Sequence, residues 1–172
     1  MAAQSTYTLI ATATGNGTST ANITFSNIPQ TYTDLVLVTS VLVNSSVGYG
    51  YTINTNISGS IYYGTTLQAN GSSVAAAQNP GANTVWYPIN ALSINTSYPT
   101  IITTHFLNYA NSTAYKSILS RQAGDFNGSG ATTEMVGVCY STSPINSITV
   151  GTNNSVYWTT SSTFNLYGIQ AA

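Results

Sequence analysis

Residues 23–43 contain the longest apolar run in the sequence, and its pattern restricts the chain to β structure. The stretch reads ITFSNIPQTYTDLVLVTSVLV. Ile23 and Phe25 alternate with polar residues, and Pro29 disfavours helix at the residue before it. β-Branched and aliphatic residues then resume, as is typical of a strand. The order predicts a strand, a corner and a second strand.

The second of these strands, residues 34–43, is apolar on both of its faces. One face carries Val36, Val38 and Leu42, and the other carries Leu35, Leu37, Val41 and Val43. A strand covered on only one side would alternate more regularly, so we expect both sides to be covered. We hypothesise that the opposite sheet covers one side and a neighbouring subunit covers the other.

The rest of the chain consists of short segments of strand-forming residues separated by Gly, Asn, Ser and Pro, and no long segment is apolar at the helical period. Strands are expected at residues 7–14, 21–26, 35–43, 49–57, 61–67, 85–89, 100–109, 115–121, 134–141, 145–150 and 162–169. Residues 69–83 and 90–99 are expected to be loops. Because no helix is available to cover a sheet, we predict one all-β domain over residues 1–172, a two-sheet antiparallel β-sandwich of jelly-roll type with roughly ten short strands. A closed barrel is the alternative.

Charge is nearly absent from this chain. Only 3% of the residues are charged, with two Lys/Arg and three Asp/Glu, against roughly a quarter in an ordinary soluble protein. The net charge of -1 provides no basic surface for phosphates, which argues against nucleic-acid binding. No secretory signal pattern and no apolar run of membrane-spanning length is visible, so we expect no membrane partner. So little charge protects a free monomer poorly against association, which favours a protein that self-associates or works bound to something else.

The residues available for catalysis do not form a recognisable motif. His105 is the only histidine, and no G-x-S-x-G sequence is present to carry a nucleophile beside it. We therefore expect His105 to be a strand residue bonded to a neighbouring Thr or Tyr. Of the three carboxylates, Asp34 fits turn chemistry, whereas Asp125 and Glu134 could approach each other across one hairpin. Nothing else indicates a cleft, so we predict that the protein is not an enzyme.

Metal and cofactor sites are not expected either. Asp125, Asn127 and Ser129 imitate the start of a calcium-binding loop, but its twelfth position is Val136 instead of Glu. A glycine-rich turn is the simpler interpretation. Cys139 is the only cysteine, which excludes an intrachain disulfide and a multi-cysteine metal site.

Aromatic residues are the remaining resource, with 13 Tyr, 4 Phe and 2 Trp. Tyrosine and tryptophan combine an apolar body with a polar tip, which suits subunit interfaces and stacking on sugar rings. Ordinary strand packing is the alternative for each of them. The candidate interface or ligand-stacking residues are Tyr49, Tyr51, Tyr62, Tyr63, Trp86, Tyr87, Tyr157 and Trp158.

Several stretches, in this order along the chain, resemble β-rich virion proteins of tailed bacteriophages. They are YTLIATATGNGTSTANITFSNIPQTYTDLVLV, SGSIYYGTTLQANGSS, LNYANSTAYKSILSR, SPINSITV and the C-terminal STFNLYGI. The two most specific parts are the I-P-Q-T-Y-T-D-L-V-L corner and the terminal S-x-F-x-L-Y-G-I strand, and neither carries chemistry. The resemblance implies a structural part of the particle, attached to the capsid exterior or to the tail.

From this resemblance and the absence of catalytic motifs we expect a capsid decoration (cement) protein that stabilises the outer surface of a phage head. Its expected partners are copies of itself, as a trimer, and the major capsid protein. Its expected location is the capsid exterior of the virion, assembled in the host cytoplasm. The alternative is a tail-fibre or adhesin-like carbohydrate-binding module that uses exposed aromatic residues to bind a glycan.

Overall fold

The computed structural model describes residues 6–45, 50–59, 61–87, 94–125, 127–152 and 156–170. These residues form antiparallel strands joined by turns and contain no helix. The strands are β1 (Tyr7–Thr14), β2 (Asn22–Phe25), β3 (Asp34–Val41), β4 (Thr52–Thr55), β5 (Tyr62–Ala69), β6 (Val74–Asn83), β7 (Thr100–Leu107), β8 (Lys116–Gly124), β9 (Ala131–Cys139), β10 (Ile148–Gly151) and β11 (Thr163–Ile169).

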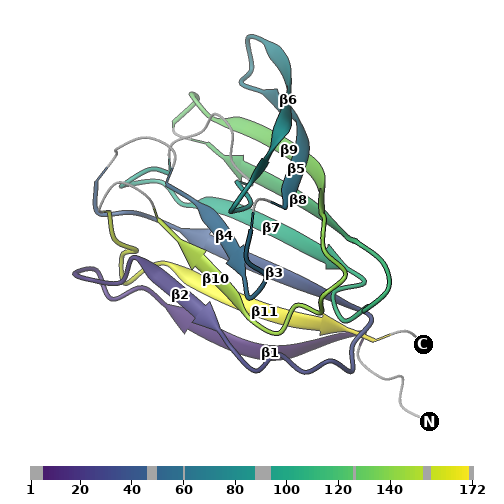
Figure 1. Ribbon diagram of the computed structural model, residues 1–172. Helices are drawn as coiled ribbons and strands as arrows, with labels where there is room; N and C mark the ends of the chain where they lie inside the picture. The colour runs from purple at the N-terminus through teal and green to yellow at the C-terminus, as the bar shows by residue number, and fades with distance from the viewer. Residues whose placement is uncertain are drawn as a thin grey trace.

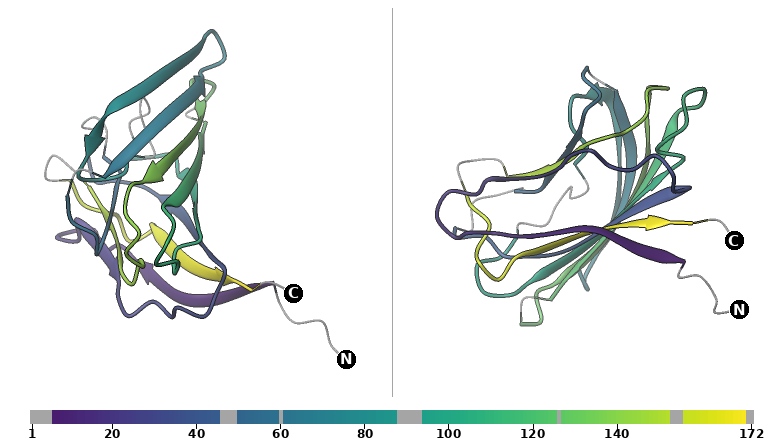
Figure 2. Two further views of the ribbon diagram at one scale, coloured as in Figure 1. Left: turned by 45° about the vertical axis from the view of Figure 1, so that its right-hand side comes forward. Right: turned by 90° about the horizontal axis from the view of Figure 1, so that it is seen from below.

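The strands form two layers of unequal size. Eight of them make one sheet in the order β1-β11-β3-β7-β8-β9-β5-β6, and three make a second sheet in the order β2-β10-β4. The small sheet lies over the β1, β11 and β3 side of the large one (Figure 1), and two further views show the layers from the side and from below (Figure 2). The prediction of an all-β, two-sheet sandwich is confirmed.

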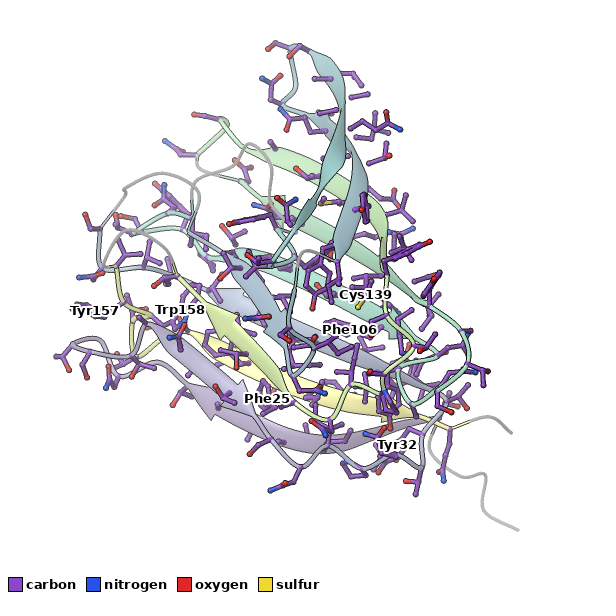
Figure 3. The ribbon with its side chains drawn as sticks, viewed as in Figure 1. Phe25, Tyr32, Phe106, Cys139, Tyr157 and Trp158 are labelled. Atoms are coloured by element: carbon purple, nitrogen blue, oxygen red, sulfur yellow. The ribbon has the colours of Figure 1, made fainter. Side chains whose placement is uncertain are left out.

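The core lies between the two sheets because both sheets turn apolar side chains inward. Ile23 and Phe25 of β2 and Ile148 of β10 are buried on the small sheet, opposite Phe164 and Leu166 of the large one. Sticks show Phe25, Phe106 and Trp158 inside the sandwich (Figure 3). The alternation along β2 and β11 therefore follows from one wet face and one buried face.

The strand β3 is fully covered by its own chain on the core side and partly covered on the outer side. Leu35, Leu37 and Val41 face the core and are fully buried. On the other face, Val36 is only 2% exposed. In the register of the sheet it lies between Tyr167 of β11 and His105 of β7. Long side chains on neighbouring strands thus supply the second cover. Val36 therefore needs no neighbouring subunit for its burial, and for the half-buried Val38 and Leu42 a covering subunit stays a prediction.

The segment expected to be a loop at residues 69–83 contains the strand β6. Its small residues, VAAAQNPGAN, gave no alternation from which a strand could be predicted. Pairing with β5 imposes the extended form, and Asn70 starts the connecting turn by accepting backbone hydrogen bonds from Ser72 and Ser73 at 3.1 and 2.9 Å. Asn side chains favour such turns. The loop prediction failed because strand pairing is a property of two segments.

Two other predicted strands are shorter than expected. The strand predicted at residues 49–57 covers only Thr52–Thr55, and the one at 85–89 is reduced to a single bridge between Trp86 and Ile53. Residues 49, 88 and 89 of these two predicted strands lie outside the described part. The remaining predicted strands agree with the structure apart from shifts of a few residues at their ends.

Candidate functional site

Four of the eight candidate aromatic residues are buried in the core. Tyr51, Tyr62 and Trp86 are each 1% exposed, and Trp158 is fully buried. Tyr49 lies outside the described residues. For the four buried side chains the structure corrects the interpretation as interface or stacking residues, because a ring inside the sandwich cannot reach a partner or a sugar. They are ordinary strand packing.

Trp86 occupies its position because two glycines make room for it. A methyl group at Gly137 would meet Trp86 Cζ3 at 2.5 Å, and one at Gly64 would meet the same atom at 3.0 Å. The indole Nε1–H donates to Ser120 Oγ at 2.9 Å, and the Ser120 hydroxyl is also 2.9 Å from Thr104 Oγ1. A buried polar chain therefore fixes the ring that lies on β5 and β9.

The buried tyrosines are bonded to threonines and remain neutral. Tyr62 Oη lies 2.8 Å from Thr55 Oγ1, and Tyr51 Oη lies 3.3 Å from Thr39 Oγ1. Burial raises the pKa of Tyr62 to about 12 and raises the pKa of Tyr51 further. Both hydroxyls therefore act as structural hydrogen-bonding groups at neutral pH.

Of the remaining candidates, only Tyr63 joins other aromatic side chains at the surface. Its ring is 6.2 Å from that of Tyr140 in an edge-to-face arrangement, and Tyr140 stacks on Tyr115 at 4.1 Å. All three are exposed. Tyr87 is 37% exposed and Tyr157 is half-buried, and neither belongs to this tyrosine cluster. We define the tyrosine cluster as Tyr63, Tyr115 and Tyr140.

Tyr115 and Tyr140 were missed because each is an isolated aromatic in the sequence. The hairpin between β8 and β9 pairs Lys116 with Cys139, so the residues that flank this pair come side by side. Knowing the register of that hairpin would have been enough to place Tyr115 next to Tyr140. The signal lay in strand pairing and not in local aromatic clustering.

The outward face of the eight-stranded sheet exposes apolar side chains along most of its width. The residues concerned occupy outward positions on five of its strands and are each at least 37% exposed: Tyr7, Leu9, Tyr63, Leu67, Val74, Ile101, Leu107 and Val136. We call this surface the outer face. Where such side chains gather into a large patch, soluble proteins commonly use the patch for contact with another molecule.

Two shallow grooves hollow the outer face where β5 lies between β6 and β9. One, of about 410 Å³, is lined by Tyr63, Thr65, Gln78 and valines of β9. The other, of about 220 Å³, is lined by Leu67 and Ala76 among others. The walls of the first groove are apolar side chains with isolated hydroxyl and amide groups, whereas the second groove also carries the Glu134 carboxylate.

Charge on the outer face is limited to a few groups. Arg121 Nη2 and Glu134 Oε1 form an exposed ion pair at 3.1 Å. His105 lies between Val36 and Leu119 in the register, and the expected hydrogen bond to a neighbouring Thr or Tyr does not occur. Burial, followed by the nearby Arg121 charge, lowers the pKa of His105, so the imidazole is neutral at physiological pH.

The three carboxylates do not converge. Asp34 Oδ1 accepts a hydrogen bond from the backbone of Asn108 at 2.7 Å, and Asp125 Oδ1 accepts one from the backbone of Gly128 at 2.7 Å. Glu134 pairs with Arg121, which is four residues before Asp125, or about 13 Å along the strand. Asp125 and Glu134 therefore do not face each other across the hairpin, and no group of three His, Cys, Asp or Glu residues gathers within the described segments.

Lys116 is buried and holds a turn in place. Its Nζ donates to the backbone carbonyls of Asn111, Ala114 and Ser141 at 2.6, 3.2 and 3.2 Å. Burial lowers the pKa of Lys116 and raises the pKa of the facing Cys139 thiol to about 11. Three donors satisfied by three carbonyls are a structural clamp, and no reactive amine is presented.

No family model, curated protein or solved structure matches this chain. A search of the described residues finds no helix with the length and hydropathy needed to cross a membrane. The apolar outer face and the tyrosine cluster, which share Tyr63, are the exposed surfaces best suited to binding another molecule.

Proposed function

We propose that this chain is a non-enzymatic structural protein of a bacteriophage virion, a capsid decoration protein that binds the outer surface of the head and stabilises it. The observation that carries the proposal is the outer face, where exposed Leu9, Leu67, Ile101 and Val136 stand beside a single ion pair. The sequence resemblance to phage virion proteins supplies the biological setting.

The physical argument is that this surface gains free energy when another protein covers it. Each buried methylene contributes about 0.8 kcal/mol, so covering several Leu, Ile and Val side chains outweighs the loss of one exposed ion pair. A nearly uncharged surface also imposes little desolvation penalty. A flat sheet face fits a broad protein surface better than it fits a small molecule, whose sites are deep and concave.

The test is binding to empty phage heads. We expect the wild-type chain to co-sediment with heads that lack it, and Val136→Lys to weaken binding about tenfold or more, because covering the face would then remove a lysine ammonium from water. Ser58→Lys adds the same charge on the exposed turn after β4 and should bind normally. Wild-type chain that stays in the supernatant, or imaging that finds its density only on the tail, would count against the proposal.

Self-association is part of the same proposal. Capsid lattices present three-fold positions, and a trimer that covers part of the outer face would match them. Sedimentation of the purified chain measures this directly, and we expect a trimer that Leu9→Lys dissociates. A monomer at all concentrations would remove the trimer from the proposal while leaving head binding open to its own test.

The tyrosine cluster favours one second function, a carbohydrate-binding module. Tyr63 borders the groove of about 410 Å³, and tyrosine faces can stack on sugar rings. A glycan array tests it: binding that Tyr63→Ala abolishes and Tyr87→Ala preserves would support a glycan ligand. Trp86 and Trp158 are unsuitable probes, since both are buried and their loss would disturb the core.

A further inference from the structure

The strand β6 is an edge of the eight-stranded sheet. It is hydrogen-bonded to β5 on one side, and no strand of the described residues pairs with it on the other. The β5–β6 hairpin reaches well beyond the small sheet, at the end of the large sheet opposite β1 (Figures 1 and 2). Edge strands with unpaired backbone groups are templates for another strand.

The hairpin turn shows which backbone groups point to the free edge. The Asn70 N–H donates to the Ser73 carbonyl, so the next pair along the hairpin, Ala69 and Val74, is not hydrogen-bonded. Hydrogen-bonded and non-hydrogen-bonded pairs alternate along an antiparallel ladder. The N–H and C=O groups of Val74, Ala76 and Gln78, which all belong to non-hydrogen-bonded pairs, therefore point away from β5. The register is continuous over these residues, with its irregularity beyond them.

Over residues 74–78 the edge carries none of the usual devices that prevent pairing, whereas Pro80 and the irregularity in the β5–β6 register lie farther along the same strand. Residues 62–83, which form both strands of the hairpin, contain no Asp, Glu, Lys, Arg or His, and the described side chains of residues 74–78 are all exposed. Pro80, which has no N–H to offer, follows this segment and limits its length. The opposite edge strand β1 is interrupted by a bulge between Leu9 and Ala11, a feature that discourages pairing.

We propose that β6 of one copy pairs antiparallel with β6 of a second copy about a two-fold axis at Ala76. In this arrangement Ala76 faces Ala76 of the second copy, and Val74 faces Gln78. Each facing pair exchanges two hydrogen bonds, which satisfies every free group of the three residues. The occupant is a second copy because the segment is self-complementary: its central residues are alanines and neither strand carries a charge that would repel its equivalent.

This contact is separate from head binding and from a trimer built on the outer face. The paired segment is short, so the free dimer is expected to be weak, and copies held close together would pair more completely. A two-fold contact of this kind would join one trimer to the next.

Cysteine cross-linking of the full chain tests the pairing residue by residue. The one native cysteine, Cys139, is fully buried and should not react. Two-fold symmetry brings Ala76 within about 5.5 Å of its equivalent, a distance that a disulfide spans, whereas two Val74 residues are about 14 Å apart. We expect oxidised Ala76→Cys to form a covalent dimer about tenfold faster than Val74→Cys does.

A mixture of two variants gives the sharper result. Val74→Cys and Gln78→Cys should each cross-link slowly alone and should cross-link to each other about as fast as Ala76→Cys does when they are mixed. Failure of Ala76→Cys to form the dimer when it is oxidised in 6 M urea, and wild-type circular dichroism for every variant in buffer, will show that the contact belongs to the folded chain. The proposal is overturned if all three variants cross-link equally, which indicates random collision, or if none cross-links at any concentration.

Discussion

The packing of Trp86 on Gly64 allows a stability test whose size follows from distances in the core. A methyl group at Gly64 would meet Met135 Cε at 2.6 Å and two indole atoms of Trp86 at 3.0 and 3.1 Å. Both neighbours are side chains, and Trp86 is 1% exposed. Gly64→Ala should therefore lower the free energy of unfolding by about 1–3 kcal/mol through overpacking.

Trp86→Phe removes the part of the ring that a methyl group at Gly64 would strike. It also removes the Nε1–H hydrogen bond to Ser120, while the Ser120 hydroxyl keeps its contact with Thr104 at 2.9 Å. The lost hydrogen bond and the remaining cavity together should lower the free energy of unfolding by about 2–4 kcal/mol.

The double variant decides whether this geometry is right. In Gly64→Ala/Trp86→Phe the new methyl group occupies space that the smaller ring has left, so the combined loss should fall short of the sum by about 1 kcal/mol or more. Gly137 provides the contrast, because a methyl group there would meet the backbone oxygen of Tyr63 at 2.0 Å. Trp86→Phe should not rescue Gly137→Ala.

Urea unfolding monitored by circular dichroism measures all of these free energies under one set of conditions. Tyr87→Phe is the matched control, since it changes an exposed aromatic residue next to Trp86 and should shift stability by only a few tenths of a kcal/mol. Strict additivity of Gly64→Ala and Trp86→Phe would refute the reasoning, as would a Gly64→Ala variant as stable as the wild type.

Three further predictions concern buried groups. Burial raises the pKa of Cys139 to about 11 and the pKa of Tyr62 to about 12. The unfolded chain therefore loses these protons at lower pH than the folded chain, and the free energy of unfolding should fall from about pH 9 upward. Cys139→Ala should reduce the fall in melting temperature between pH 9 and 11. Lys116→Met leaves three carbonyls without their donor and should cost about 3 kcal/mol in urea unfolding, and unchanged stability would contradict the clamp. Thr133→Val replaces a buried hydroxyl that has no hydrogen-bond partner and should raise the melting temperature, whereas the exposed change Val136→Thr should leave it unchanged.

Much of the fold could be predicted because each strand carries its own signal. The alternation in β2 and β11 reflects one wet and one buried face, and Pro29 and the Asn-rich turns mark the corners. The exception, β6, has alanines where a strand usually carries branched residues. Its extended form comes from pairing with β5. The sequence of one segment alone does not show which other segment it pairs with.

The candidate surface was harder to predict than the fold, for a related reason. Adjacent aromatics such as Trp86–Tyr87 and Tyr157–Trp158 attract attention in a sequence, yet neighbours on a strand point to opposite faces. One member of each pair is therefore buried, as Trp86 and Trp158 are. The exposed tyrosine cluster is assembled from separate strands, and its members become neighbours only once the register of β5, β8 and β9 is known.

The two faces of the large sheet also differ in a way that stability alone does not explain. Its inner face buries polar side chains, and those of Thr100, Gln122 and Thr133 have no hydrogen-bond partner among the described residues, although an unpaired buried polar group destabilises a folded monomer. Its outer face exposes Leu67 and Val136, whose burial would contribute stability. A chain selected only to fold as a monomer would reverse these assignments. Apolar residues exposed on one face while polar residues occupy the interior are what a surface for protein contact requires.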